Sequence, residues 1–204
     1  MNNQNDGRRV RMTKMLLKSS LIEIMKTKSI HTISIKEICE GADVNRSTFY
    51  RHYDTQYDLY DDIIEDIAAD LADIYNSPTV PERTSIIFLT KVLQYIEDNR
   101  ETFLVILSDN GKISLGEAFN RFTNRFIELE NASEASLYVT QFIAAGLTST
   151  LWTWLNKENR RSPREVASLL YSIIMNGMGR AIKYSAGIKE TMAKREAEKQ
   201  EKKA

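Results

Sequence analysis

The stretch that decides the fold covers residues 34–60 and reads SIKEICEGADVNRSTFYRHYDTQYDLY. Ser34, followed three residues later by Glu37, forms a capping box, which predicts a helix that begins with the residue after Ser34. Gly41 is expected to end this helix, and Asn45 is expected to cap a second short helix. A short helix, a tight turn and a second short helix are the layout of a helix-turn-helix, whose second helix can enter the major groove of DNA.

The second helix is expected to run to about Tyr53 and to have an apolar and a polar side. Val44 and Phe49 should pack inward. The side chains on the other side are the ones that we predict to contact DNA: Arg46, Ser47, Thr48, Tyr50 and Arg51. The first arginine is long enough to reach guanine O6 and N7, and the two small hydroxyl residues after it permit a close approach to bases or backbone.

Charge is distributed unevenly, although the net charge of the whole chain is zero. Residues 8–53 hold ten Lys and Arg against four acids, which is a net charge of +6, and residues 54–75 hold eight acids and no Lys or Arg. A basic lobe beside an acidic helix fits contact with a phosphate backbone. The alternative is ordinary solvated surface charge. Within the lobe, Ser34 and Lys36 should bring backbone N–H groups, a positive helix end and a cation to one phosphate.

The chain of 204 residues is predicted to be all-α, because its 42% of hydrophobic residues recur at three- and four-residue spacing without long β-branched alternation. Other helices are expected at residues 11–26, from Asp54 or Thr55 to about 75, and at 82–99, 100–108, 112–130, 134–156 and 163–185. A second capping box, Ser162 with Glu165, starts the last of these. We predict a helix-turn-helix domain at residues 1–53, a helical regulatory and dimerisation domain at 54–188, and a charged, disordered or frayed tail at 189–204.

A specific motif runs through the helix-turn-helix, namely Val-x-x-x-Thr-Phe-Tyr-x-His-Tyr from Val44 to Tyr53. The chain resembles the TetR-type bacterial transcriptional regulators in this motif, in the amphipathic helix before it, in the run ISIKEIC at 33–39 and in Leu59 after it. The residues at 146, 152–155 and 162–165 are similar to a C-terminal subgroup common in Gram-positive bacteria. The resemblance implies a homodimer formed by the last two long helices and, in many members, a small-molecule pocket in the C-terminal domain.

The resemblance also gives roles to single residues. Tyr50 and His52 stand at positions that contact the DNA backbone in the family, although an ordinary surface histidine is the alternative for His52. Gln56 stands where the family commonly has a lysine that reaches phosphate, and Asp43 where it commonly has glycine. Glutamine can still donate to a phosphate oxygen, but the charge-assisted contact is lost. This departure puts the strength of DNA binding in question more than its location.

The dimer interface is predicted on the two long helices at 134–156 and 163–185. The first is apolar around most of its circumference, and the second carries a wide apolar stripe, which fits helices that pack on two sides. The predicted interface residues are Trp152, Leu155, Leu170, Ile173, Ile174 and Gly177. The alternative is a plain buried core. Although the 22 residues from 135 to 156 lack charge and could span a bilayer, their Thr, Ser and Gly content favours a buried helix.

An effector pocket is predicted from aromatic residues that recur at helical spacing: Phe88, Tyr95, Phe103, Phe119, Phe122 and Phe126. The alternative is that they form core. By the resemblance, a small apolar ligand would act by favouring one spacing of the two DNA-reading units.

Other functional classes have little support in the sequence. Two His and one Cys leave few candidates for nucleophilic or metal chemistry, so we predict no enzyme, metal or cofactor. The polar N-terminus does not resemble a signal peptide, and the cytoplasm is expected. The predicted function is a dimeric repressor that reads a palindromic operator in double-stranded DNA. The alternative is a co-activator or nucleoid-associated protein of the same fold that acts mainly through protein partners.

Overall fold

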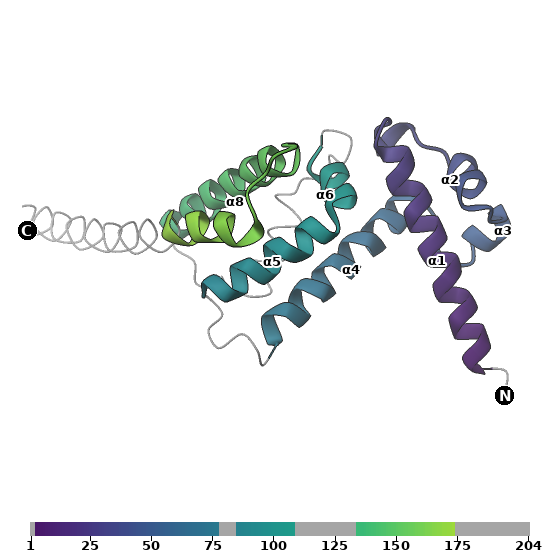
Figure 1. Ribbon diagram of the computed structural model, residues 1–204. Coiled ribbons are helices and arrows are strands. Elements are labelled where there is room, and N and C mark those ends of the chain that lie inside the picture. The colour runs from purple at the N-terminus through teal and green to yellow at the C-terminus, as the bar shows by residue number, and fades with distance from the viewer. Residues whose placement is uncertain (1–2, 78–84, 109–133, 174–204) are drawn as a thin grey trace, which may run out of the picture.

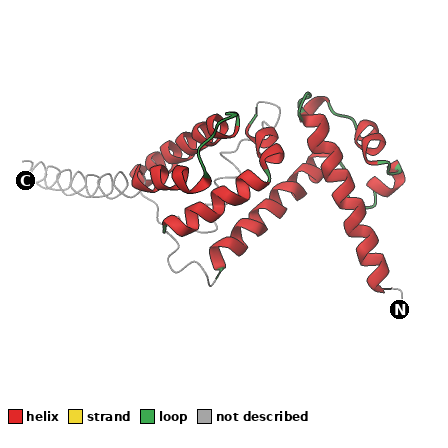
Figure 2. Ribbon diagram, in the orientation of Figure 1, coloured by secondary structure: helices red, strands yellow, loops and turns green. Residues whose placement is uncertain are grey.

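The computed structural model describes residues 3–77, 85–108 and 134–173, which form helices joined by turns and loops (Figures 1 and 2). The elements are α1 (Asn3–Met25), the 3-10 helix η1 (Ile30–Thr32), α2 (Ile35–Ala42), α3 (Arg46–Phe49), α4 (Gln56–Asn76), α5 (Ile86–Asp98), α6 (Arg100–Leu107) and α8 (Glu134–Leu155). A further helix covers residues 163–173. These ranges contain no strand, so the predicted all-α class is confirmed. The helix predicted at 112–130 and the tail at 189–204 lie outside the described residues.

The α1–α3 unit lies at one end of the molecule, and α4 leads from it towards α5 (Figure 1). The predicted capping box at the start of α2 is confirmed, since the Ser34 side chain accepts from the Glu37 N–H and the Glu37 side chain accepts from the Ser34 N–H. The prediction that Gly41 ends α2 is wrong, because the helix continues to Ala42 and Asp43 is its C-cap.

Gly41 serves close packing between α1 and α2 instead. A Cβ at this position would lie well inside the van der Waals contact distance of the Ser20 hydroxyl of α1. That hydroxyl is buried and donates to the carbonyl of Ile38 at 2.8 Å. The absent side chain therefore lets α1 supply a hydrogen bond to the backbone of α2.

The α-helical part of α3 is shorter than predicted. It ends at Phe49, and the chain continues to Tyr53 in tight turns, with the Tyr53 N–H donating to the Phe49 carbonyl at 3.0 Å. Phe49 is fully buried, as predicted, and Tyr53 is nearly so. Their core continues into α4 and α6 through Leu59, Tyr60, Ile63, Val105 and Ile106. The hydrophobic core of the α1–α3 unit thus extends past residue 53, where the domain boundary was expected.

Charged side chains join α1 to α4 beside this core. Lys14 lies 3.2 Å from the Asp62 carboxylate, and Lys18 contacts both Asp62, at 3.1 Å, and Asp66, at 2.5 Å. The Tyr53 hydroxyl donates to the same Asp62 carboxylate. Lys14 also lies over the Tyr53 ring. We call these five residues the α1–α4 junction.

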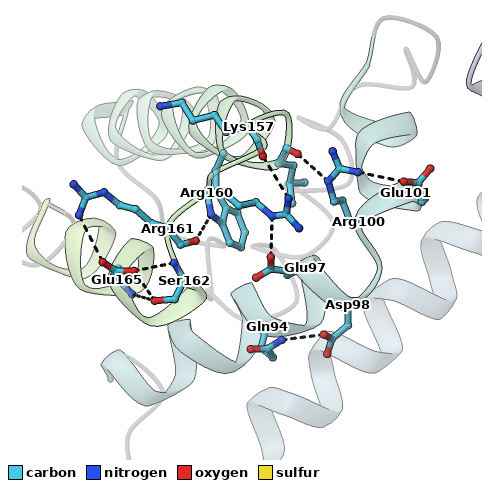
Figure 3. A network of polar contacts seen from close by, with 12 residues as sticks. Gln94, Glu97, Asp98, Arg100, Glu101, Lys157, Arg160, Arg161, Ser162 and Glu165 are labelled. Carbon is cyan, nitrogen blue, oxygen red and sulfur yellow. Dashed lines mark hydrogen bonds and ion pairs between the residues drawn. The ribbon is translucent and has the colours of Figure 1, made fainter.

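A second core forms where α5, α6, α8 and the helix at 163–173 meet. Polar contacts fix the end of α8 on α5 and α6 (Figure 3). Arg100 Nε donates to the Leu155 carbonyl at 2.9 Å, which places a cation at the negative end of α8. Arg160 Nε donates to Glu97 at 2.8 Å. The predicted capping box of Ser162 with Glu165 is also confirmed.

The charge-free stretch before residue 157 is part of α8. Of the helices that the structure describes, none combines the length and the apolar character that a membrane span requires.

Candidate nucleic-acid interface

The outer side of α3 and of the turn after it carries the polar residues that the motif placed there. Arg46, Ser47 and Arg51 are exposed, and Tyr50 is 50% exposed. Thr48 and His52 are half-buried. The backbone beneath them is set by two anchors, the Asn45 side chain, which accepts from the Ser47 N–H, and the buried ring of Phe49. That these residues contact DNA stays a prediction.

The cations of the basic lobe fall into two groups. The five lysines are paired with carboxylates: Lys14 and Lys18 at the α1–α4 junction, Lys26 with Glu23 and Glu101, Lys28 with Glu37, and Lys36 with Glu40. The five arginines, which are Arg8, Arg9, Arg11, Arg46 and Arg51, pair with no carboxylate in the part of the chain that the structure describes. The cations of the lobe that have no described carboxylate partner are therefore all arginines, whereas Lys36 is exposed and lies 3.7 Å from Glu40, beyond hydrogen-bond distance.

Two open grooves flank α3. The first, which we call the α2 groove, measures about 600 Å³, and its cationic walls are Lys36 and Arg46. The second, the α1 groove, measures about 610 Å³. It is lined by Arg9, Val10 and Thr13 of α1, by Thr48, Arg51 and His52 of α3 and the following turn, and by residues 43–45, which it shares with the α2 groove. The residues predicted to contact DNA on α3 and the turn after it thus form a ridge between two grooves, and each groove is lined by at least one arginine. We call this surface the α3 ridge; it consists of Arg46, Ser47, Thr48, Tyr50, Arg51 and His52.

His52 lies in positive surroundings. Burial lowers the pKa of its imidazole below the ordinary value of 6.5, and the charges of Lys14 and Arg51 lower it further. The ring is therefore mainly neutral at pH 7. A phosphate beside it would favour the protonated form and raise its pKa.

The start of α2 is less open to phosphate than the sequence predicted. The Ser34 N–H and hydroxyl both donate to the Glu37 carboxylate, at 2.9 and 2.8 Å. Hydrogen bonds from Lys28 and from Ser34 hold the pKa of Glu37 at about 2, so this carboxylate stays ionised. A negative charge that belongs to the protein thus occupies the helix end, and the exposed ammonium of Lys36 remains the better phosphate donor there.

Comparisons with known proteins point to one family. Residues 84–176 match a TetR-type family model described as a transcriptional regulator C-terminal region. A TetR transcriptional regulator from Streptococcus agalactiae has a similar structure, with a TM-score of 0.61 and 18% sequence identity over 84% of this chain and 98% of that one. A TetR-family regulator from Streptomyces coelicolor has a TM-score of 0.57 and 16% identity over 89% and 88% of the two chains. No curated protein matches the chain.

The chain has the fold of the TetR-type transcriptional regulators, and its C-terminal region matches a model of that family. The matched model covers the C-terminal helices, the neighbours share the fold along nearly the whole chain, and the helix-turn-helix motif supplies the N-terminal part. This family and these neighbours are regulators of transcription and not enzymes.

The two departures from the TetR-type pattern have structural explanations. Asp43 has φ 52° and ψ 44°, which is the left-handed region that favours glycine, and among the described non-glycine residues no other has a positive φ. Asp58, two residues after Gln56, has a capping role, because its carboxylate accepts from the N–H groups of Asp54 and Thr55. Gln56 itself is half-buried in the first turn of α4.

The predicted interface residues of this TetR-type regulator divide between surface and core. Trp152 is 39% exposed and Ile173 is 65% exposed. Leu155 and Leu170 are buried in the subunit's own second core, so they have almost no surface to offer a partner. Ile174 and Gly177 lie outside the described residues. Phe142 and Leu169, which belong to the apolar faces behind the dimer prediction, are exposed, and so is Tyr138, which the sequence analysis did not select.

The described members of the predicted effector pocket pack in aromatic pairs. Phe88 lies edge-on to Tyr75 with the ring centroids 5.8 Å apart, and Tyr95 lies edge-on to Phe103 at 6.0 Å. The Tyr95 hydroxyl donates to Asp70 of α4 at 2.8 Å. The other three members, Phe119, Phe122 and Phe126, lie outside the described residues, so the pocket stays a prediction.

Proposed function

We propose that this TetR-type regulator is a repressor that binds a palindromic DNA operator as a homodimer, with α3 of each subunit in the major groove. The observation that carries the proposal is the ridge of exposed polar side chains on α3. Arg46 and Arg51 on this ridge have no carboxylate partner among the described residues, and grooves lie on both sides. A polyanion is the ligand that such a surface recognises best.

Each side chain on the ridge has a distinct chemical role in this proposal. Arg46 is long and exposed, and a bidentate pair with guanine O6 and N7 suits its guanidinium. Ser47 and Thr48 are small enough to let the backbone of α3 approach the base edges. Tyr50 and His52 donate to phosphates, which fixes the register of α3 without selecting sequence.

The dimer is supported by the exposed apolar side chains of α8 and of the helix at 163–173. Phe142 is 79% exposed, Tyr138 62% and Ile173 65%, and exposed large apolar groups of this kind mark association surfaces. The contacts of Arg100 and Arg160 fix the end of α8 on α5 and α6 (Figure 3). A two-fold dimer of such subunits would place its recognition helices about 34–36 Å apart, one turn of the duplex.

The DNA-binding part is tested by gel shift on an operator selected from a random pool of duplexes. Arg46→Ala and Tyr50→Ala should each weaken binding about 10-fold or more, in line with roughly 1–3 kcal/mol for a good base contact. Arg164→Ala removes an equally exposed arginine from the other end of the molecule and should leave binding unchanged. Circular dichroism checks that all variants stay helical. Wild-type affinity in both ridge variants would refute the assignment of α3.

The dimer is tested by light scattering at micromolar concentration. Ile173→Glu places a charge on the proposed apolar contact and should produce monomers, while Arg164→Glu changes an exposed position nine residues earlier on the same helix and should not. A wild-type protein that stays monomeric would remove both the dimer and the palindrome from the proposal.

The proposal includes release from DNA by a small apolar effector bound in the C-terminal domain, which the resemblance to the family supports. A ligand that raises the melting temperature of the free protein and weakens the operator complex would establish it. Such coupling requires that the ligand bind with different affinities to two conformations of the dimer, which differ in the spacing of the two helix-turn-helix units.

The second candidate is a co-activator or nucleoid-associated protein that works mainly through protein partners. It is favoured by the loss of the phosphate-binding lysine at Gln56 and by the acidic helix α4. Genomic footprinting separates the two functions. A repressor protects a few palindromes in promoters, whereas a nucleoid-associated protein covers many sites and a co-activator covers none without its partner.

A further inference from the structure

We propose that the α1 groove is a second binding site for the DNA backbone, in which Arg9 of α1 and Arg51 after α3 bind phosphate groups that flank the bases read by α3. The inference deepens the proposed DNA-binding function and rests on it. It adds to the interface the N-terminal part of α1, which the helix-turn-helix motif does not include.

The groove is built from three segments that are distant in sequence. Arg9, Val10 and Thr13 come from α1, residues 43–45 from the turn before α3, and Thr48, Arg51 and His52 from α3 and the turn after it. Arg51 Nη2 donates to the Thr48 hydroxyl at 3.3 Å, so the guanidinium is held on the groove wall. Arg9 stands on the opposite wall, on α1. The two arginines can therefore hold an extended strand between them.

The charges along the groove favour phosphate over other ligands. Arg9 and Arg51 pair with none of the described carboxylates, whereas Lys14, one turn further along α1, is held by Asp62. Asp43 is the one acid that lines the groove, so two guanidinium groups face one carboxylate. The groove is open, and two aliphatic side chains, Val10 and Val44, stand among seven polar or charged lining residues, which makes an enclosed apolar ligand a poor fit.

The hydroxyl and imidazole groups of the lining complete a phosphate-binding set. Thr13, Thr48 and His52 are half-buried along the groove. Neutral donors of this type position a DNA backbone, while arginines supply most of the affinity. Burial is the main cause of the lowered pKa of His52, and the charges of Lys14 and Arg51 lower it further, which agrees with a positive potential at this place.

The test compares two arginines on the same helix. Arg9→Ala removes a cation from the groove wall, and Arg11→Ala removes one from an exposed position two residues along that does not line the groove. Both changes alter net charge equally. Operator affinity is measured by fluorescence anisotropy from about 50 to 300 mM salt, because each phosphate contact contributes about 0.9 to the slope of log K against log salt.

We expect Arg9→Ala to weaken operator binding at least fivefold at low salt and to reduce the salt slope by about 2 per dimer, one contact for each subunit. Arg11→Ala should change affinity by less than twofold. Arg9→Lys should keep the salt slope, since the charge remains. Selection from a random pool should return the same bases with Arg9→Ala as with wild type, because phosphate contacts carry no sequence information.

The proposal is overturned if Arg9→Ala and Arg11→Ala behave alike at every salt concentration, or if Arg9→Ala changes the selected bases. Failure of the DNA-binding function itself has a different signature, in which wild-type protein binds operator and scrambled duplex equally and Arg46→Ala has no effect. Circular dichroism on Arg9→Ala confirms that α1 is intact.

Discussion

The α1–α4 junction and the α3 ridge use cations of the same basic lobe in opposite ways. At the junction, Lys14 and Lys18 contact the acids of α4 at 2.5–3.2 Å. On the ridge, Arg46 and Arg51 face solvent without a described carboxylate partner. Paired cations fix one helix on another, and unpaired cations remain available to a ligand. The net charge of +6 therefore does not show how many of the ten Lys and Arg side chains can contact DNA.

At the α1–α4 junction, burial and hydrogen bonds from charged and polar groups shift the pKa of Asp62 in opposite directions. Burial raises the pKa of the Asp62 carboxyl, but hydrogen bonds from Tyr53, Lys18 and Lys14 outweigh it and hold the pKa below its ordinary value. Burial and the adjacent Asp62 raise the pKa of Tyr53 far above its ordinary value. Asp62 is therefore ionised and Tyr53 neutral at pH 7, which is the combination that keeps α1 attached to α4.

The largest expected effect comes from the core that both regions share. Phe49 is fully buried under the α3 ridge, and its ring contacts Tyr53 of the junction at 5.6 Å between centroids. Phe49→Ala should lower the free energy of unfolding by roughly 3–5 kcal/mol, from lost burial and the cavity left behind. Urea denaturation measures this, with Arg46→Ala as the exposed control at below about 0.5 kcal/mol. Similar losses in the two variants would mean that the ridge does not stand on this core.

The next prediction is a crossed comparison between Lys18 and Arg51. Lys18→Ala leaves Asp62 and Asp66 with fewer partners and should lower the free energy of unfolding by about 1–2 kcal/mol, with an unchanged salt slope of DNA binding. Arg51→Ala should leave stability within about 0.5 kcal/mol of wild type and reduce DNA affinity and its salt slope. Chemical denaturation and anisotropy titrations on both variants measure the four quantities. If Lys18→Ala reduces the salt slope as much as Arg51→Ala does, paired and unpaired cations are not functionally distinct.

Sequence reasoning reached the helix-turn-helix because its signals are local. Both capping boxes and the Asn45 cap depend on residues two or three positions apart, and all three form as predicted. The buried position of Phe49 follows from the same periodicity. The role of Gly41 was misread, because a glycine near a helix end has the same local signal whether it caps the helix or admits a neighbour such as Ser20.

Features that depend on contacts between distant segments could not be predicted in this way. The residues near Lys18 and Arg51 in the sequence do not indicate which of the two pairs with a carboxylate. The partner acids of Lys18 are in α4, more than 40 positions away. The burial of Leu155 and Leu170 depends likewise on the position of α5 and α6. Arg9 was counted in the basic lobe but not selected as a contact, because its groove exists only when α1 passes beside α3.

Asp43 allows a smaller test of the ridge, in which backbone strain and charge are separated. Asparagine tolerates the left-handed region as aspartate does, so Asp43→Asn removes the charge alone and should strengthen DNA binding about two- to fivefold, with stability nearly unchanged. Asp43→Gly also relieves the backbone and should raise the free energy of unfolding by roughly 0.5–1 kcal/mol. Weaker DNA binding by Asp43→Asn would mean that the carboxylate contacts a base instead of opposing phosphate.

The smallest expected effect is a pH dependence of DNA binding through His52. The pKa of the free imidazole is below 6.5, and a bound phosphate should raise it, so binding takes up a proton between the two pKa values and affinity increases as pH falls through that window. Folding has the opposite sign. Because the folded pKa is depressed, the stability that His52 contributes is present above about 6.5 and is lost as pH falls towards the folded pKa.

Operator affinity should therefore rise from pH 7.5 to 6.0 while the melting temperature falls slightly. His52→Gln keeps a hydrogen-bond donor and should remove the pH dependence of binding. The matched control is the chain's other histidine, because His31 contacts Tyr57 at the start of α4 and lines neither groove, so His31→Gln should keep the pH dependence. Anisotropy titrations at five pH values and constant ionic strength measure both variants. If His52→Gln leaves the pH dependence of DNA binding unchanged, His52 does not contact a phosphate. The ligand-binding groups of the α3 ridge would then be its arginines and hydroxyls.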